Sequence, residues 1–280
     1  MNTTTTFQKR TLSVPGGTLY YEVRGAGPLL LMMPGGPADA TTFRGIEDRL
    51  ATRYTVVTYD PRGLSHSSPF DPRDDQRMVE IFADDAHRLI EEMGDGRADV
   101  FASSGGAVIA MDLVKHHPEH LGTVVLHEPP APDFLADPAG TRAAMADVCD
   151  TCAREGVWPA AAKFMKLIGV EGGPPPAGEG EPTPEQLEAM AMMQRNFEFF
   201  FGRYIRNLSR YEVDVDALKA CPCRIVAAVG VDSAGQLAHN GGLGLAKALG
   251  IDVTTFPGDH GGFDGRAEEF GPRLLEVLEG

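Results

Sequence analysis

A serine in a strand–turn–helix pattern is the first candidate for chemistry in this sequence. Ser104 follows the apolar run Ala98–Ala102, and the segment Ala107–His116 has a helical pattern. Small residues stand two positions before and after Ser104, where a sharp turn leaves no room for larger side chains. This context is typical of a nucleophile elbow, which exposes a hydroxyl beside a helix N-terminus. Ser103 fits less well, because Phe101 would then occupy a small-residue position, so we predict Ser104 as the nucleophile.

Two glycine-rich loops supply the other groups that a serine nucleophile needs. The loop Pro34–Pro37 follows the apolar run Leu29–Met33, and its glycines allow close approach of a substrate to the backbone. We predict that the N–H groups of Gly36 and Gly105 bind an oxyanion. His260 lies in the second loop, between the last predicted strand and the last predicted helix. Imidazole can take the serine proton and return it, so His260 is the predicted general base.

The elements that must position these residues alternate along the chain. Short apolar runs between helical patterns predict an α/β fold with a mostly parallel sheet and helices on both of its faces. A hairpin is predicted from Arg10–Val14, the turn Pro15–Gly17 and Thr18–Arg24. The other predicted strands are Leu29–Met33, Tyr54–Tyr59, Ala98–Ala102, Thr123–His127, Arg224–Val229 and Asp252–Phe256. The predicted helices are Val79–Met93, Ala107–His116, Leu243–Leu249 and Glu268–Leu278.

Residues 130–220 interrupt this alternation, since they contain no convincing strand. We predict that residues 1–129 and 221–280 form the core domain and that residues 130–220 form a helical cap over the C-terminal edge of the sheet. Within the cap, Glu171–Pro182 is rich in Gly, Pro and Glu and is predicted to be a mobile loop. A helix then begins with Thr183 as N-cap, Pro184 in the first position and Gln186 completing a capping box.

The helix after Thr183 carries more apolar residues than one buried face requires. One stripe contains Met190, Met193, Phe197, Phe200 and Tyr204, and further apolar residues lie off it. A helix of this kind is expected to be covered on two sides. We predict that one side faces the core and that Met193, Phe197 and Phe200 bind substrate. The alternative is that the second side packs within the cap or against a second copy of the chain in a homodimer.

Composition and charge limit the kinds of partner that can be expected for this protein. The chain has 280 residues, enough for one large domain and an insertion. A net charge of −15 repels phosphate backbones and anionic lipid, so neither nucleic acid nor a membrane is expected as a partner. Met1–Arg10 has no apolar segment typical of a targeting signal, and no run is long enough to span a membrane. A cytoplasmic location is therefore expected.

The four cysteines are paired closely in sequence. Cys149 and Cys152 have the spacing of half a zinc ribbon, but Cys221 and Cys223 are one residue too close for the other half. We therefore expect reduced thiols and no bound metal.

Together these segments resemble the α/β-hydrolase superfamily. The matching blocks are Leu29–Pro37, Tyr59–Ser68, Val100–Ala110, Val124–Pro130 and Thr255–Phe263, which span the chain outside the cap. The serine also precedes the histidine, as it does in that superfamily. The resemblance implies the α/β-hydrolase fold, a Ser–His–acid triad, a pocket under the cap and no cofactor.

Two narrower resemblances bear on the substrate. The segments Ser103–Gly105 and His127–Pro130 are similar to those of the fungal zearalenone-lactone hydrolases, and Pro34–Pro37 with Asp60–Gly63 is similar to proline iminopeptidases. The sequence departs from both, because Pro34 replaces a histidine common before the oxyanion glycines and the cap matches neither. The substrate therefore cannot be carried over from either family.

Two carboxylates compete for the role of triad acid. Asp232 follows the strand after which most α/β-hydrolases hold their acid, and Glu128 follows the preceding strand, where the resembled lactone hydrolases hold theirs. Asp232 comes two residues after Gly230 instead of the usual three, so that Ser233 occupies the expected position. Glu128 leaves a buried strand and enters two prolines, where an unpaired carboxylate would be costly. We predict Glu128, with Asp232 as the alternative.

The predicted function is a serine hydrolase that cleaves an ester or lactone bond of a small, largely apolar molecule through an acyl-enzyme intermediate. The alternatives of the same fold are an aminopeptidase and a C–C bond hydrolase. A small-molecule receptor with little turnover is the alternative outside the enzymes, because a fold does not fix a function.

Overall fold

The computed structural model describes residues 7–94, 96–170 and 182–280. All but the last residue of the predicted loop Glu171–Pro182 lies outside these ranges. None of the helices within them is both long and apolar enough to cross a lipid bilayer.

An eight-stranded sheet forms the centre of the molecule, in the order β1-β2-β4-β3-β5-β6-β7-β8. The first two strands form a hairpin, and β2 pairs antiparallel with β4, while all later pairs are parallel. The strands are β1 Gln8–Val14, β2 Gly17–Arg24, β3 Leu29–Met33, β4 Thr55–Tyr59, β5 Ala98–Ser103, β6 Leu121–His127, β7 Arg224–Gly230 and β8 Val253–Phe256. The predicted α/β-hydrolase fold with a mostly parallel sheet is confirmed.

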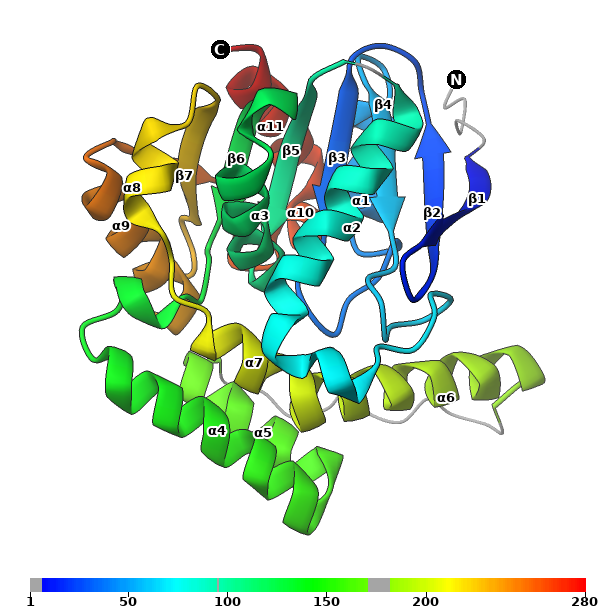
Figure 1. Ribbon diagram of the computed structural model, residues 1–280, viewed down its shortest axis with the longest axis vertical. Helices are drawn as coiled ribbons and strands as arrows, with labels where there is room; N and C mark the ends of the chain where they lie inside the picture. Colours follow the sequence, from blue (N-terminus) through cyan, green and yellow to red (C-terminus); the bar gives the residue numbers. More distant parts are fainter. Residues whose placement is uncertain (1–6, 95, 171–181) are drawn as a thin grey trace.

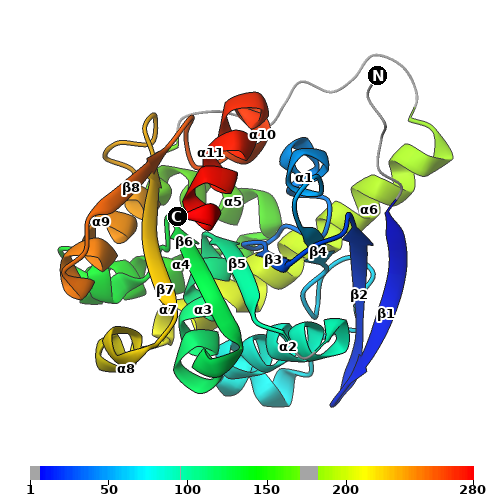
Figure 2. The ribbon, with the colours of Figure 1, turned by 90° about the horizontal axis from the view of Figure 1, so that it is seen from above.

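Helices cover both faces of the sheet (Figure 2). On one face lie α1 Arg44–Leu50, α10 Gly262–Gly265 and α11 Ala267–Glu279, and on the other lie α2 Met78–Met93, α3 Gly105–His116, α8 Val215–Ala220 and α9 Leu237–Leu249. Successive residues of a strand therefore enter different cores: Leu30 packs in the core with α1 and α11, and Leu31 packs in the core with α2 and α3. This two-sided burial explains why the strands are continuously apolar.

Residues between β6 and β7 form helices in their described parts. These are α4 Pro138–Glu155, α5 Val157–Ile168, α6 Pro184–Phe199, a π-helix at Phe200–Tyr204, α7 Ile205–Arg210 and the short α8. Helices α4 to α7, which we call the cap layer, lie across the C-terminal ends of the parallel strands (Figure 1). The predicted capping box at Thr183 and Gln186 is present at the start of α6.

One of the two cysteine pairs differs from the expectation that all four cysteines are reduced. Cys221 and Cys223 form a disulfide, with Cα atoms 5.3 Å apart. The expectation of reduced thiols is wrong here, because the bend at Pro222 brings the two side chains together. Cys149 and Cys152 are free thiols on α4. Within the described ranges, no group of three or more His, Cys, Asp or Glu side chains is arranged to hold a metal ion.

Candidate active site

Ser104 stands at the turn between β5 and α3 in a backbone conformation that few residues adopt. Its φ and ψ are 56° and −126°, and its N–H donates to the His127 carbonyl at 2.9 Å. Gly106 shows why small residues flank the turn, because a methyl group there would lie 2.4 Å from the Met33 carbonyl oxygen. A positive φ on a non-glycine residue is strained and is maintained only where the surroundings enforce it. The elbow therefore fixes Ser104 at the edge of the sheet.

Glu128 leaves the end of β6 in a second strained conformation, with φ 49°. Its N–H donates to the Ala228 carbonyl on β7 at 2.9 Å, and the side chain is completely buried. Oε2 lies 2.6 Å from Nδ1 of His260, and Oε1 accepts hydrogen bonds from the Gly230 N–H at 2.8 Å and from the Ser233 hydroxyl. Both oxygens of this carboxylate are thus held by donors.

Electrostatics keep Glu128 ionised. Burial alone raises the pKa of Glu128, but the hydrogen bond from His260 and the neighbouring His127 and His260 rings outweigh burial and lower the pKa to about 2. An ionised carboxylate only accepts hydrogen bonds, so Nδ1 of His260 carries a proton and donates it to this bond. Nε2 is then the nitrogen of His260 that is left to take up a proton.

The other candidate acid is in a different place. Asp232 is exposed, and its backbone N–H donates to the Gly258 carbonyl at 2.9 Å. Ser233, one residue later, is completely buried and donates to Glu128. The structure therefore brings Glu128 into contact with His260. It leaves the Asp232 side chain exposed at the surface.

A cavity of about 160 Å³ lies beneath the cap layer, and residues from several separate loops line it. Ser104, His260, Gly36 and Gly105 all line it, so the predicted nucleophile, base and oxyanion donors share one space. Gly105 is the first residue of α3, and its N–H has no intrahelical acceptor.

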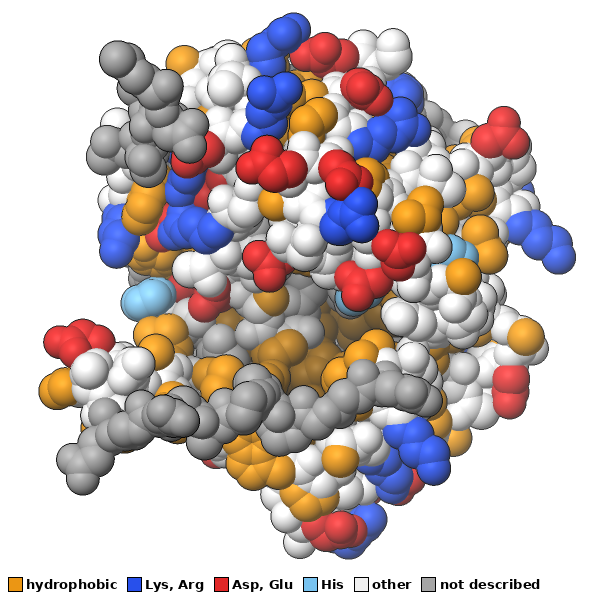
Figure 3. Space-filling view, turned by 180° about the vertical axis from the view of Figure 1, so that it is seen from behind, with side chains coloured by type: hydrophobic (Ala, Val, Ile, Leu, Met, Phe, Trp, Pro, Cys, Tyr) orange, Lys and Arg blue, Asp and Glu red, His pale blue; other side chains and the backbone are white. Residues whose placement is uncertain are grey.

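The remaining walls of this cavity are mostly apolar. Figure 3 shows a hollow with hydrophobic side chains in its floor. The apolar side chains come mainly from the cap layer and include Met145, Phe164, Ile168, Phe200, Ile205 and Leu208. Besides Ser104 and His260, the polar side chains are Tyr204, Ser209 and Gln236. Tyr204 belongs to the stripe seen in the sequence, whereas no sequence pattern marks Ser209 or Gln236.

The predicted substrate-binding residues need a correction. Phe200 lines the cavity, but Met193 and Phe197 do not. Met193 is 46% exposed, because the first turns of α6 extend past the rest of the cap layer (Figure 1). Phe197 packs against Trp158 and Phe201. The expectation that the helix is covered on two sides along its length is wrong for its first half.

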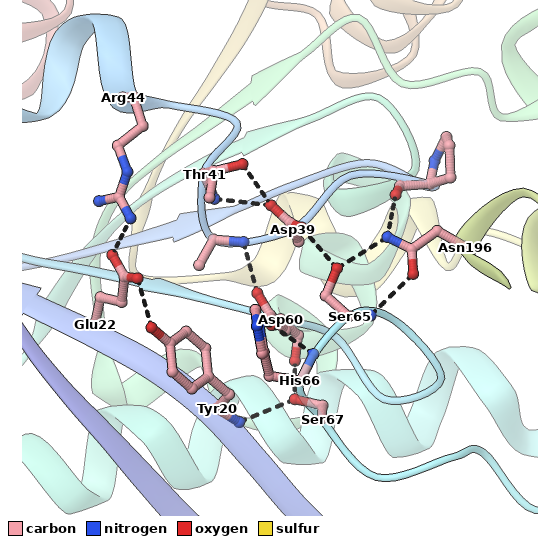
Figure 4. Close-up of polar contacts among 12 residues, drawn as sticks. Tyr20, Glu22, Asp39, Thr41, Arg44, Asp60, Ser65, His66, Ser67 and Asn196 are labelled. Carbon is pink, nitrogen blue, oxygen red and sulfur yellow. Dashed lines mark hydrogen bonds and ion pairs between the residues drawn. The ribbon is translucent and has the colours of Figure 1, made fainter. Parts of the chain in front are cut away.

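A polar network ties α6 to the loops beside the site (Figure 4). Asn196 is buried on α6, and its amide oxygen accepts from the Ser65 N–H at 2.9 Å. Its NH₂ group donates to the Ser65 hydroxyl at 2.9 Å and to the Pro37 carbonyl at 3.3 Å. The Ser65 hydroxyl in turn donates to Asp39 at 2.6 Å. Asn196 thus connects the cap layer to the loop that contains Gly36.

A buried carboxylate organises the two loops below Asn196. Asp60 accepts from the N–H groups of Ala40 and His66, both at 2.9 Å, and one of its oxygens lies 2.8 Å from the His66 ring (Figure 4). Asp60 belongs to the Tyr59–Ser68 block that carried part of the resemblance. Its contacts are structural, since none of these three residues lines the cavity.

Comparisons with known proteins agree with the fold. Residues 28–154 match the family described as alpha/beta hydrolase fold. The chain is 33% identical to the uncharacterized hydrolase YraK of Bacillus subtilis (strain 168), over 98% of this chain and 97% of that protein. It is 27% identical to a zearalenone hydrolase of Bionectria ochroleuca, over 44% of this chain and 47% of that one. The structure is similar to the enol-lactonase of Burkholderia xenovorans LB400, with TM-score 0.72, 16% identity and coverage of 97% and 100% of the two chains.

The chain belongs to the α/β-hydrolase fold family, and it is a hydrolase.

Proposed function

We propose that this protein is a serine hydrolase that cleaves an ester or lactone bond of a small, largely apolar molecule. The observation that carries the proposal is the contact of buried Glu128 with His260 at 2.6 Å, beside the cavity that His260 and Ser104 both line. A serine hydroxyl is a weak nucleophile until a positioned base removes its proton. The pair supplies such a base, oriented by a carboxylate that is itself held by Gly230 and Ser233.

The proposed reaction has two halves. The Ser104 oxygen attacks the carbonyl carbon while Nε2 of His260 takes the serine proton, and the N–H groups of Gly36 and Gly105 bind the resulting oxyanion. The carbon–oxygen bond of the ester then breaks, and His260 returns the proton to the leaving oxygen. Water, activated by His260, attacks the acyl-enzyme, and the carboxylic acid leaves as Ser104 regains its proton. In a lactone the leaving oxygen stays attached, so the product is a hydroxy acid.

The walls of the cavity favour an ester or lactone over an aminoacyl substrate. An aminopeptidase needs an anion to bind the α-ammonium group, because an unpaired charge is costly in an apolar site. The described residues that line the cavity include no Asp or Glu. The name of the similar enol-lactonase points to the same class of bond.

A panel of substrates tests the proposal. We expect turnover of a short-chain nitrophenyl ester and of an apolar lactone, and little turnover of an aminoacyl anilide. Ser104→Ala should remove this activity by at least about three powers of ten while the fold is retained. Turnover of the aminoacyl anilide alone would favour an aminopeptidase. Tight binding of small molecules without any turnover would favour a receptor.

A further inference from the structure

One tyrosine of the cap layer lies directly beside the two predicted oxyanion glycines. Tyr204 ends the π-helix and lines the cavity. A methyl group placed on Gly105 would lie 2.7 Å from the Tyr204 hydroxyl oxygen, and one placed on Gly36 would lie 3.1 Å from its Cε1 atom. The edge of the Tyr204 ring therefore spans both glycines, and its oxygen is on the Gly105 side.

The ring of Tyr204 is held firmly in this position. The residue is only 2% exposed, and its ring packs at centroid distances of 5.9 Å from Phe82 and 5.7 Å from Phe200. The π-helix widens the turn that carries both Phe200 and Tyr204, and such turns occur frequently at functional sites. A donor fixed in this way needs no reorganisation during the reaction, which is the condition for strong electrostatic stabilisation.

The hydroxyl is available as a donor. Burial raises the pKa of Tyr204 well above its usual range, so the group stays protonated and can donate a hydrogen bond. The other candidates are less suitable. The Ser209 hydroxyl already donates to the Arg206 carbonyl at 3.0 Å, and Gln236 is the N-cap residue of α9, outside the cap layer.

We propose that the Tyr204 hydroxyl donates a hydrogen bond to the oxyanion formed on Ser104, as a third donor beside the N–H groups of Gly36 and Gly105. This inference rests on the proposed function, because it requires a tetrahedral intermediate at Ser104. The negative charge exists only after attack, so this hydrogen bond strengthens in the transition state and acts on kcat more than on KM. Loss of one oxyanion donor elsewhere costs about 10²- to 10³-fold in kcat.

Tyr204→Phe is the test, with Tyr21→Phe as the matched control. Tyr21 is a buried tyrosine of β2 that does not line the cavity, so its replacement removes the same oxygen outside the cavity. We expect kcat for a nitrophenyl ester to fall about 100-fold in Tyr204→Phe, with KM changed by less than about threefold. The control should keep both values.

A pair of inhibitors separates charge stabilisation from packing. A trifluoromethyl ketone forms a tetrahedral oxyanion with a serine nucleophile, whereas the methyl ketone of the same chain binds mainly as an intact carbonyl. Tyr204→Phe should weaken the trifluoromethyl ketone about 100-fold and the methyl ketone little. The ratio of the two affinities does not depend on the fraction of folded protein, so it is informative even if the variant is less stable.

The outcomes that overturn the inference differ from those that overturn the proposed function. If both ketones were weakened equally, so that the ratio of their affinities stayed unchanged, Tyr204 would only pack against the site. A rise in KM alone or a gain in kcat would show the same. A wild-type protein that neither hydrolyses esters nor forms the trifluoromethyl ketone adduct would instead remove the proposed function.

Discussion

Replacing Glu128 by glutamine tests the orienting carboxylate with almost no change in shape. In the wild-type protein, Oε1 accepts from the Gly230 N–H at 2.8 Å and from the Ser233 hydroxyl, while Oε2 faces Nδ1 of His260 at 2.6 Å. An amide can satisfy the first two donors only through its oxygen, so its NH₂ group must point to His260.

The consequence for His260 is a change of tautomer. An NH₂ group cannot accept a hydrogen bond, so Nδ1 has to give up its proton and the neutral ring carries it on Nε2. A protonated Nε2 cannot take the proton of Ser104. The corresponding amide replacement in a serine protease lowers kcat by about 10⁴-fold, which is about 5.5 kcal/mol in activation free energy. We expect the same magnitude in Glu128→Gln.

The fold should survive the replacement. Burial raises the pKa of Glu128, but its hydrogen bond with His260 and the nearby imidazoles lower the pKa to about 2 from a usual 4.5. At about 1.4 kcal/mol for each pH unit, the carboxylate contributes up to about 3 kcal/mol to the free energy of unfolding at pH 7. Thermal melting should therefore show a less stable but folded variant.

The assay is steady-state hydrolysis of a nitrophenyl ester, with Asp232→Asn as the matched control. Asp232 is exposed, so its amide should keep kcat within about threefold of the wild type, as is usual for surface sites. If Asp232→Asn lost about four powers of ten and folded Glu128→Gln did not, the reasoning from the Glu128–His260 pair would be refuted.

Three further predictions follow from other parts of the structure. Burial lowers the pKa of His127 from 6.5 to about 4, so the unfolded chain takes up the proton first. The free energy of unfolding should then fall by up to about 3 kcal/mol as the pH drops from 6.5 to 4, and urea titrations of His127→Phe should show a shallower fall. Asn196→Ala removes the bonds to Ser65 and should cost about 1–3 kcal/mol in the same assay, whereas an unchanged midpoint would contradict the network. Phe200→Ala should shift preference toward bulkier acyl chains in an ester series and Met193→Ala should not, because Phe200 lines the cavity and Met193 does not.

Much of the fold could be predicted because its determinants are local. The β3 strand is a continuous apolar run, and burial on both faces of the sheet requires this. The turn at Ser104 needs small neighbours for a steric reason that is visible in the sequence, and the close contact of Gly106 with the Met33 carbonyl shows that reason in space. Similarly, the two prolines after Glu128 indicated a fixed carboxylate before any partner was known.

The rest depends on contacts between distant segments. Periodicity places Met193 and Phe200 on one stripe, but it does not say that α6 extends past the cap layer or that a π-helix follows it. Ser233 donates to Glu128 although the two residues are 105 positions apart in the sequence, so this contact exists only once the chain has folded. The contact of Tyr204 with the oxyanion glycines likewise requires the cap layer to be placed on the sheet.

Covalent labelling of the nucleophile tests the central proposal most directly. Ser103 is 2% exposed, and its hydroxyl lies 3.1 Å from Nδ1 of His127, whereas Ser104 lines the cavity. A serine-directed fluorophosphonate, followed by peptide mass spectrometry, should give one adduct on Ser104, formed in step with the loss of ester hydrolysis and absent from Ser104→Ala. An adduct on Ser103, or full hydrolysis by a protein labelled at Ser104, would contradict the account.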